Sequence, residues 1–182
     1  ALIFGGTRGT GKTTTARILA AALNCSLSTD GDACGSCPSC KSVQTTSSIA
    51  VIEVDAASNG GVAEVRRIKD LVAYSHDGQY RVILLDEAHS MSKDAFNALL
   101  KLLEEPPPNT IFVLLTTEVE KILGTVRSRS THFDFRRMTT ENVIGRLREI
   151  AEAENIQYEP SLLEEIALRA QGGMRDAVML LD

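Results

Sequence analysis

The sequence lacks several features that would assign it to a specialised class of protein. None of its apolar runs approaches eighteen residues, so no membrane span is predicted. It shows no secretory leader, internal repeat, low-complexity segment or long block of like charge. Acidic residues also outnumber basic ones, 24 to 19. The formal net charge of −5 argues against wrapping nucleic acid through general basicity, although a local basic patch would still permit DNA contact.

What remains is the composition of an ordinary globular protein. The 182 residues are 43% hydrophobic and 24% charged, enough for one sizeable core and a small second unit. The chain starts in the apolar stretch "ALIF" and stops at "VMLLD". Both ends therefore lead us to expect a piece of a longer protein.

Short apolar runs alternate with helix-like segments in the first three quarters of the chain. The runs rich in Val, Ile, Leu and Phe predict strands at Leu2–Phe4, Ala50–Val54, Arg81–Leu85, Thr110–Leu115 and His132–Phe135. Helices are predicted at Lys12–Leu23, Val62–Tyr74 and Lys93–Glu105, the last with Ser92 as its N-cap. This alternation favours an α/β fold with a mostly parallel, five-stranded sheet.

Beyond about Arg137 the pattern is helical throughout. Amphipathic helices are predicted at Thr140–Asn155, Ser161–Gln171 and Met174–Leu181. "SLLE" has capping-box spacing from Ser161, and Gly172–Gly173 marks the other end of that helix. We therefore predict an α/β domain over residues 1–138 and a small, truncated helical lid domain over residues 139–182.

A phosphate-binding loop follows the first predicted strand. "GTRGTGKT" fits G-x-x-x-x-G-K-[ST] between a strand and a helix, the context that this motif requires. Its backbone N–H groups and the helix N-terminus would face phosphates, Lys12 would meet the β- and γ-phosphates, and Thr13 would hold Mg²⁺. The predicted nucleotide-binding residues are Gly6, Thr7, Arg8, Gly9, Thr10, Gly11, Lys12, Thr13, Thr14 and Asp86.

Two carboxylates end a buried strand in "RVILLDEAH". Asp86 would stand at the carboxyl end of the sheet and suits Mg²⁺, while Glu87 is the better candidate for a general base that activates water. The next strand ends in Thr116 and Thr117, either of which could position that water, although threonines are also simply good strand formers.

All four cysteines lie between residues 25 and 40. The spacing Cys25-x8-Cys34-x2-Cys37-x2-Cys40 predicts a closed tetrahedral Zn²⁺ site, with an iron–sulfur cluster as the main rival. Disulfides are not expected in a protein of the cytosol, where thiols stay reduced. Such a site would fasten an inserted loop and supply shape, and a partner surface, rather than chemistry.

The order of these motifs resembles the gamma/tau subunit family of bacterial DNA polymerase III, the AAA+ ATPases of the sliding-clamp loader. The resemblance covers essentially the whole chain. It rests on "GTRGTGKTTTARILAAALNC", the cysteine insert, "DAASNGGVAEVRRIKD", "LLDEAHSMSKDAFNALLKLLEEPP", "TTEVEKI" and "RSRS". The family also has a zinc module at this place. It implies an AAA+ P-loop fold with a zinc insert and a helical lid.

The resemblance also implies roles for matching residues. Lys12 and Thr13 would be Walker A residues, Asp86 and Glu87 would be Walker B, and Thr117, rather than Thr116, would be the first sensor. Arg129 in "SRS" would be an arginine finger acting in trans on a neighbouring subunit's ATP. Arg175 in "GGMRDA" would be the lid's second sensor.

The function that follows is an ATP-hydrolysing motor of the clamp loader, active only in the assembled complex. Its cofactors would be ATP, Mg²⁺ and Zn²⁺. Its partners would be the delta and delta-prime subunits, further gamma/tau copies, the sliding clamp and primer–template DNA, in the cytoplasm and without a membrane. The alternatives are a non-hydrolysing scaffold like delta-prime and a nucleotide kinase with a zinc lid. Arg66, Arg67 and Lys69 are candidate DNA contacts, or equally a solvated helix face.

Overall fold

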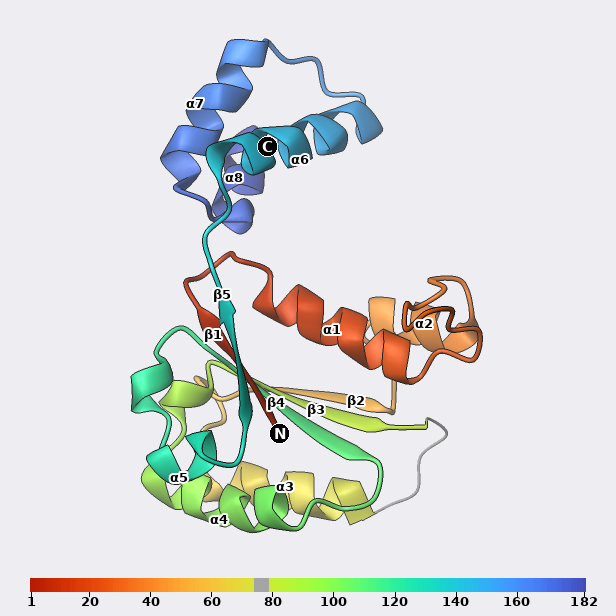
Figure 1. The fold of residues 1–182 in the computed structure, drawn as a ribbon, viewed down its shortest axis with the longest axis vertical. Coiled ribbons are helices and arrows are strands. Elements are labelled where there is room, and N and C mark those ends of the chain that lie inside the picture. Colours follow the sequence, from red (N-terminus) through yellow and green to blue (C-terminus); the bar gives the residue numbers. More distant parts are fainter. Residues whose placement is uncertain (74–78) are drawn as a thin grey trace. The chain divides into compact units, whose positions relative to one another are not determined.

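The computed structural model describes residues 1–73 and 79–182 and contains a five-stranded sheet (Figure 1). The strands are β1 (Leu2–Gly6), β2 (Val51–Asp55), β3 (Arg81–Asp86), β4 (Thr110–Thr116) and β5 (Thr131–Phe135). Their order in the sheet is β2-β3-β4-β1-β5, and the β2–β3, β3–β4 and β1–β4 pairings are parallel. Asp55 is in register with Asp86, and Gly5 with Thr116, so the strand ends form one polar edge.

Helices cover both faces of this sheet. Figure 1 shows α1 and α2 on one face and α3 and α4 on the other. The helices in the described residues are α1 (Lys12–Leu23), α2 (Pro38–Gln44), α3 (Val62–Ala73), α4 (Lys93–Glu104), α5 (Gly124–Arg127), α6 (Thr140–Ala153), α7 (Pro160–Ala170) and α8 (Met174–Leu181), with 3₁₀ turns η1 (Ala88–Ser90) and η2 (Val119–Lys121).

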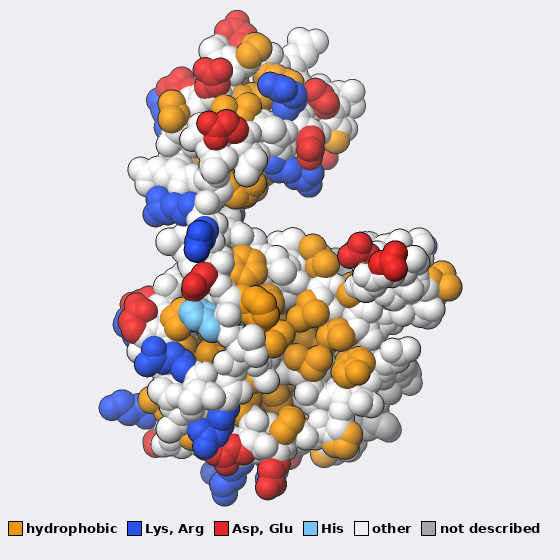
Figure 2. Space-filling model, in the orientation of Figure 1, with side chains coloured by type: hydrophobic (Ala, Val, Ile, Leu, Met, Phe, Trp, Pro, Cys, Tyr) orange, Lys and Arg blue, Asp and Glu red, His pale blue; other side chains and the backbone are white. Residues whose placement is uncertain are grey.

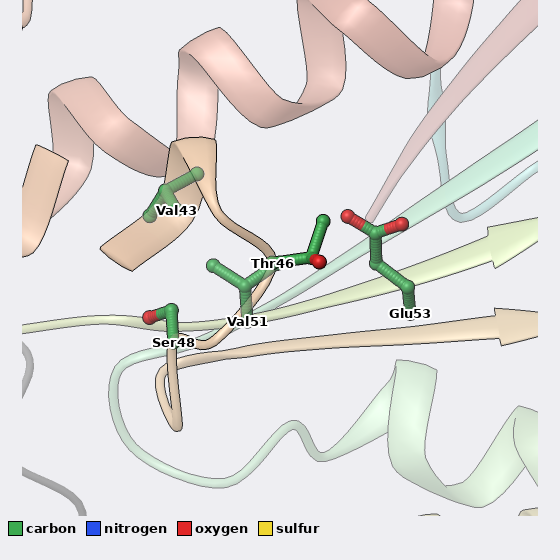
Figure 3. Close-up of a pocket in the computed structure, with 5 residues that line it drawn as sticks. All are labelled: Val43, Thr46, Ser48, Val51 and Glu53. Carbon is green, nitrogen blue, oxygen red and sulfur yellow. The ribbon is translucent and has the colours of Figure 1, made fainter. Parts of the chain in front are cut away.

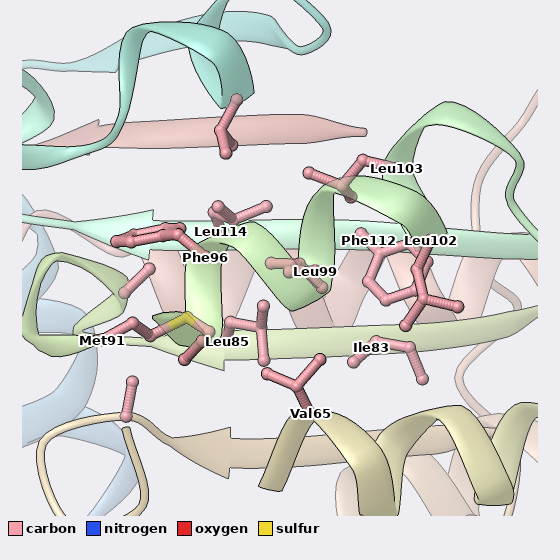
Figure 4. Close-up of a cluster of buried hydrophobic side chains, with 14 of the residues drawn as sticks. Val65, Ile83, Leu85, Met91, Phe96, Leu99, Leu102, Leu103, Phe112 and Leu114 are labelled. Carbon is pink, nitrogen blue, oxygen red and sulfur yellow. The ribbon is translucent and has the colours of Figure 1, made fainter. Parts of the chain in front are cut away.

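The main core lies between the sheet and the α3–α4 layer. In β3 the first five residues are all buried, as expected for a central strand covered on both faces. Figure 4 shows Ile83 and Leu85 of β3 and Phe112 and Leu114 of β4 facing apolar side chains of α4. Burial of these side chains fixes the position at which β3 and β4 end.

The chain forms two compact units. One comprises Ala1–Gly5 with Thr13–Phe133, and the other comprises Gly6–Lys12 with Asp134–Asp182. In the second unit, α6, α7 and α8 pack around a small core that includes Val143, Leu147 and Ile166. Acidic and basic side chains are interspersed over the face of these helices drawn in Figure 2. The phosphate-loop residues belong to this unit by their contacts, whereas the predicted division at residue 138 stays a prediction.

The predicted α/β architecture with a helical tail is confirmed, and most element ends agree within one or two residues. Ser92 caps α4 as predicted, its Oγ accepting the N–H of Ala95 at 3.1 Å. The Ser161 capping box is wrong, because α7 begins at Pro160 with Glu159 as N-cap. Proline fits the first helical position, where no N–H donor is needed. Tyr74, the predicted end of α3, lies outside the described residues.

Candidate functional site

Asp86 stands at the carboxyl end of β3, beside the start of α1. Thr13 Oγ1 donates a hydrogen bond to Asp86 Oδ2 at 3.1 Å. The other oxygen, Oδ1, accepts the N–H of Glu87 at 2.9 Å. Both carboxylate oxygens are thus oriented, and a hydroxyl and a carboxylate are brought together from residues 73 positions apart in sequence. Hydroxyl and carboxylate oxygens are ligand atoms that Mg²⁺ prefers.

Glu87 has an unusual backbone and an unusual side chain. Its φ is 48°, in the left-handed region that non-glycine residues rarely occupy. This conformation turns the chain sharply out of β3 and into η1. Among the described residues Glu87 Oε2 is buried without a hydrogen-bond partner. Strained backbone and an unpaired carboxylate oxygen are both features that accompany functional sites.

The strand-end site, as we call it, comprises Thr13, Asp86 and Glu87 together with His89, Thr116 and Glu118. No role was assigned to His89 or Glu118 from the sequence. His89 Nδ1 lies 3.0 Å from the hydroxyl of Thr116 and 3.5 Å from Glu87 Oε2. On its other side, Nε2 lies 3.4 Å from Glu118 Oε1. The site therefore joins the end of β3 to the end of β4 through one imidazole ring.

The phosphate loop, Gly6–Lys12, is described within the second unit. Gly9 and Gly11 have φ of 78° and 93°, and a Cβ on Gly6 would lie 2.1 Å from the carbonyl oxygen of Phe135. Thr10 Oγ1 donates to the carbonyl of Thr7 at 2.8 Å. The Lys12 side chain is buried, and its ammonium donates to the carbonyls of Gly6 and Thr7 at 2.8 and 2.9 Å. A buried ammonium at a glycine-rich helix start fits a polyphosphate.

Arg175 lies beside this loop in the same unit. The N–H of Met174 donates to the Gly9 carbonyl at 2.9 Å. A Cβ on Gly9 would lie 3.5 Å from the Cβ of Arg175 and 3.3 Å from the Cα of Gly173. The start of α8 thus contacts the phosphate loop through its backbone. The second-sensor role of Arg175 stays a prediction.

The remaining predicted residues of the nucleotide site, Thr117 and Arg129, belong to the first unit. Thr117 is half-buried at the end of β4, whereas its neighbour Thr116 is fully buried and makes the hydrogen bond to His89. Arg129 makes an ion pair with Glu104 at 3.0 Å and donates to the carbonyl of Thr125 at 2.9 Å. The finger role of Arg129 and the sensor role of Thr117 stay predictions.

The candidate DNA contacts lie together on α3. Arg66, Arg67 and Lys69 are exposed, and Arg67 makes an ion pair with Glu64 at 3.1 Å. This arrangement is compatible with both interpretations of these basic side chains, as contacts to DNA phosphates and as part of a solvated helix face.

The four cysteines lie in one cluster within residues 25–44, here called the cysteine module. The Sγ atoms of Cys25, Cys34, Cys37 and Cys40 all lie within 4.8 Å of one another. Tetrahedral zinc with Zn–S bonds of about 2.3 Å requires sulfur atoms about 3.8 Å apart, close to the 4.0 Å between Cys25 and Cys37. A set of four thiols in this arrangement fits a closed structural metal site.

Backbone N–H groups point at the sulfurs of the module. The N–H of Cys34 donates to Cys25 Sγ, that of Cys37 to Cys34 Sγ and that of Cys40 to Cys37 Sγ, at 3.3 to 3.4 Å. The bond from Cys40 lowers the pKa of the Cys37 thiol to about 6, whereas desolvation raises the pKa of Cys40 to about 12. N–H donors of this kind stabilise the thiolate form that ligates a metal.

A shallow pocket of about 170 Å³ lies between the cysteine module and β2 (Figure 3). Its lining residues are Val43, Thr46, Ser48, Val51 and Glu53. Glu53 is engaged by Arg17, whose Nε and Nη2 donate to its two oxygens at 2.7 Å each. None of the predicted nucleotide residues lines this pocket, so we do not assign it to the nucleotide site.

The chain combines a phosphate loop, a parallel strand that ends in Asp86 and a helical tail, and its fold is that of an AAA+ P-loop protein. The fold is similar to that of the RuvB Holliday-junction branch-migration motor of Thermotoga maritima, with a TM-score of 0.69 at 18% identity over 99% of this chain and 52% of that one. A gamma subunit-related DNA polymerase III protein of Thermotoga maritima gives 0.61, also at 18% identity, 99% coverage of this chain and 52% of that one.

Residues 1–139 match the family profile described as "DNA polymerase III, delta subunit", and residues 142–182 match "DNA polymerase III clamp loader subunit, ATPase lid domain". The chain belongs to this family of bacterial DNA polymerase III clamp-loader subunits. It is 49% identical to the tau subunit of Bacillus subtilis and 40% identical to that of Escherichia coli over its whole length. The chain spans 32% and 28% of these two proteins.

The expected resemblance to the gamma/tau clamp-loader family is thereby confirmed. None of the helices in the described part of the chain is both long and apolar enough to cross a membrane.

Proposed function

We propose that this chain is the ATP-binding and ATP-hydrolysing part of a clamp-loader subunit that places the sliding clamp on primed DNA. The observation that carries the proposal is the Thr13–Asp86 hydrogen bond of 3.1 Å, which holds a hydroxyl and a carboxylate together beside Glu87. A subunit that only served as a scaffold would have no need of this arrangement. Because the chain is about a third of its relatives' length, the activity belongs to the complete subunit in its assembly.

In this proposal each residue of the site has a separate task. The Lys12 ammonium exchanges the carbonyls of Gly6 and Thr7 for β- and γ-phosphate oxygens. Thr13 and Asp86 would hold Mg²⁺, directly or through water, and the ion when bound neutralises charge on the phosphates. Glu87 accepts a proton from the attacking water, whose oxygen forms the new bond to the γ-phosphorus as the bond to ADP breaks.

Three further residues would respond to the phosphate. Thr117 is proposed to orient the water or sense the γ-phosphate from the end of β4. Arg175 would contact the γ-phosphate in its own subunit. Arg129 would exchange its ion pair with Glu104 for the nucleotide of a neighbouring subunit, where a guanidinium stabilises charge on the transferring group.

The cysteine module is proposed to hold one Zn²⁺ through Cys25, Cys34, Cys37 and Cys40. The four-thiol donor set and the sulfur separations within 4.8 Å support a closed site without a position for substrate. The ion would cross-link the loop before α2 to the end of α1 and so shape a surface for partners.

A non-hydrolysing, scaffold-like subunit remains the second candidate, because the profile over residues 1–139 is described as a delta subunit. The intact Lys12, Thr13, Asp86 and Glu87 favour hydrolysis. A nucleotide kinase receives no support from the family match. As a replication protein the subunit would act in the cytoplasm, with delta, delta-prime and further gamma/tau copies as partners.

The proposal is tested by ATP turnover of the full-length subunit assembled with its partner subunits, sliding clamp and primed DNA. Each component is omitted in turn. We expect phosphate release that depends on the assembly, rises with clamp and DNA and leaves no phosphorylated acceptor. Tight ATP binding without turnover in the complete mixture would instead identify the scaffold.

A further inference from the structure

His89 lies between carboxylates supplied by two neighbouring strand ends. Its Nδ1 faces Glu87 Oε2 at 3.5 Å and the Thr116 hydroxyl at 3.0 Å, while its Nε2 faces Glu118 Oε1 at 3.4 Å. The side chain is only 15% exposed, so these groups are its main partners. A neutral imidazole carries one N–H, and only one side of the ring can therefore receive a hydrogen bond from it.

The surroundings favour the proton on Nε2. Lys121 Nζ donates to Glu118 at 2.9 Å, and this bond lowers the pKa of the Glu118 carboxyl. Ionised Glu118 can only accept, which draws the N–H of His89 to its side. Thr116 Oγ1 already accepts the N–H of Glu118 at 3.0 Å, so its own proton is available for an unprotonated Nδ1.

With the proton on Nε2, the ring turns a lone pair toward Glu87. This agrees with the buried Glu87 Oε2, which has no hydrogen-bond partner among the described residues although Nδ1 is 3.5 Å away. The opposite tautomer would direct its N–H at the Thr116 hydroxyl, 3.0 Å from Nδ1, and would bring that proton close to Glu87 Oε2, which is 3.5 Å from Nδ1. A general base needs a free lone pair for the proton of water, so a proton on the side of the ring that faces Glu87 would weaken it.

We propose that His89 is a positioning residue for Glu87, held by Glu118 and Thr116 in the tautomer that packs against the carboxylate without donating to it. This inference rests on the proposed role of Glu87 as general base. Thr117, the proposed sensor, follows β4 and lies in sequence between Thr116 and Glu118, the two residues that orient the ring.

The tautomer is measured without any turnover. Full-length protein labelled with ¹⁵N in histidine is compared with its His89→Gln variant, whose missing signals identify His89. We expect the Nε2–H pattern in the wild type. Glu118→Gln carries an amide that can donate to Nε2, so it should shift the ring to Nδ1–H. An Nδ1–H pattern in the wild type, or no shift in Glu118→Gln, overturns the proposal.

Turnover of the assembled complex gives the second arm. Glu118→Gln should lower kcat about tenfold with KM unchanged, a fraction of the roughly 10²–10⁴ that a general base contributes. Glu120 is exposed and lies on η2, the 3₁₀ turn for which Glu118 is the N-cap; Glu120→Gln makes the same charge change and should match the wild type. Glu118→Asp keeps the charge and should recover part of the loss.

The outcomes separate this inference from the proposed function. A wild-type assembly without turnover would refute the proposed function. The tautomer measurement would still test the position of the His89 proton, because it does not depend on turnover. An active wild type with an equally active Glu118→Gln variant would refute the inference. So would a Glu118→Asp variant as impaired as Glu118→Gln, because the loss would then not follow the charge.

Discussion

The sheet and the cysteine module obtain their structure from different interactions. Between the sheet and α3–α4, the described residues include eighteen buried apolar side chains in one cluster. The cluster of the cysteine module has five buried members, and three of them are cysteines. Apolar burial of about 25 cal/mol per Å² can stabilise the first region but leaves little for the second. We infer that the sheet folds by burial, whereas the module depends on its metal.

Metal removal should give the largest effect and should unfold the cysteine module while leaving the sheet folded. Cys37→Ser removes a buried thiol that is proposed to be a ligand, and structural zinc sites in peptides bind with about 10–16 kcal/mol. We expect metal analysis to find one zinc per wild-type chain and none in the variant. Hydrogen exchange should rise in residues 25–44 and remain slow in β3 and β4.

Ser39→Ala, in the same helix as Cys40, is the matched control and should retain the zinc. Iron with visible absorption, or the absence of metal from wild-type protein, would contradict the assignment. Equal loss of exchange protection in β3 would contradict the independence of the two regions.

Substitutions at the strand ends should leave both regions folded and change only the chemistry. Glu87→Gln keeps the shape of the side chain but removes the base, so turnover in the assembly should fall by roughly 10²–10⁴. ATP should still bind and should then remain unhydrolysed.

Lys12→Ala should instead weaken nucleotide binding itself, because it removes the ammonium that meets the phosphates. Nucleotide retention assays with phosphate release distinguish the two, and normal turnover by Glu87→Gln would refute its role.

A cavity in the apolar core should destabilise the sheet and leave the cysteine module intact, which is the opposite of what metal removal should do. Leu99 on α4 is fully buried in the main cluster (Figure 4), so Leu99→Ala should reduce the free energy of unfolding by about 2–5 kcal/mol. The zinc content should not change. Leu27→Ala removes the same atoms from a side chain that is 64% exposed and should be nearly neutral in denaturant unfolding. A zinc loss in Leu99→Ala would show that the regions fold as one.

The same contrast explains how far the sequence could be interpreted. The strands were predictable because uninterrupted Val, Ile and Leu runs such as Val82–Leu85 are typical of buried parallel strands. Helix α2 was not predicted. It has seven residues, and its N-cap is Cys37, whose sulfur accepts the N–H of Cys40. That cap follows from the thiol cluster and not from helix-forming residues.

The strand-end site was predicted in part for a related reason. Asp86 and Glu87 follow their strand directly in the sequence, so their place at the sheet edge could be inferred. His89 and Glu118 become neighbours only because β3 pairs with β4, a long-range fact that no local pattern contains. His89 is part of "DEAH", but these four residues do not indicate which groups contact its ring.

The smallest effect is expected in a turn that hydrogen bonds hold at the edge of the sheet. Asp55 ends β2, and its side chain accepts the Ser58 hydroxyl at 2.8 Å and the N–H of Ala57 at 2.9 Å. The Ser58 bond and then the Ala57 bond lower the pKa of this carboxyl below its ordinary 3.8. A lowered folded-state pKa gives stability that is present above the unfolded value and is lost as pH falls through the folded one.

Asp55→Asn keeps the shape of the side chain and removes that pH-dependent part. The variant should unfold at slightly lower denaturant than the wild type at pH 7. The difference should begin to shrink as pH falls below about 3.8 and should vanish only below the lower pKa of the folded state, where both side chains are neutral. Asp70→Asn on the exposed face of α3 is the control for net charge. A difference that persisted undiminished at acid pH would mean that the turn depends on packing, as the sheet does, and not on the ionised carboxylate.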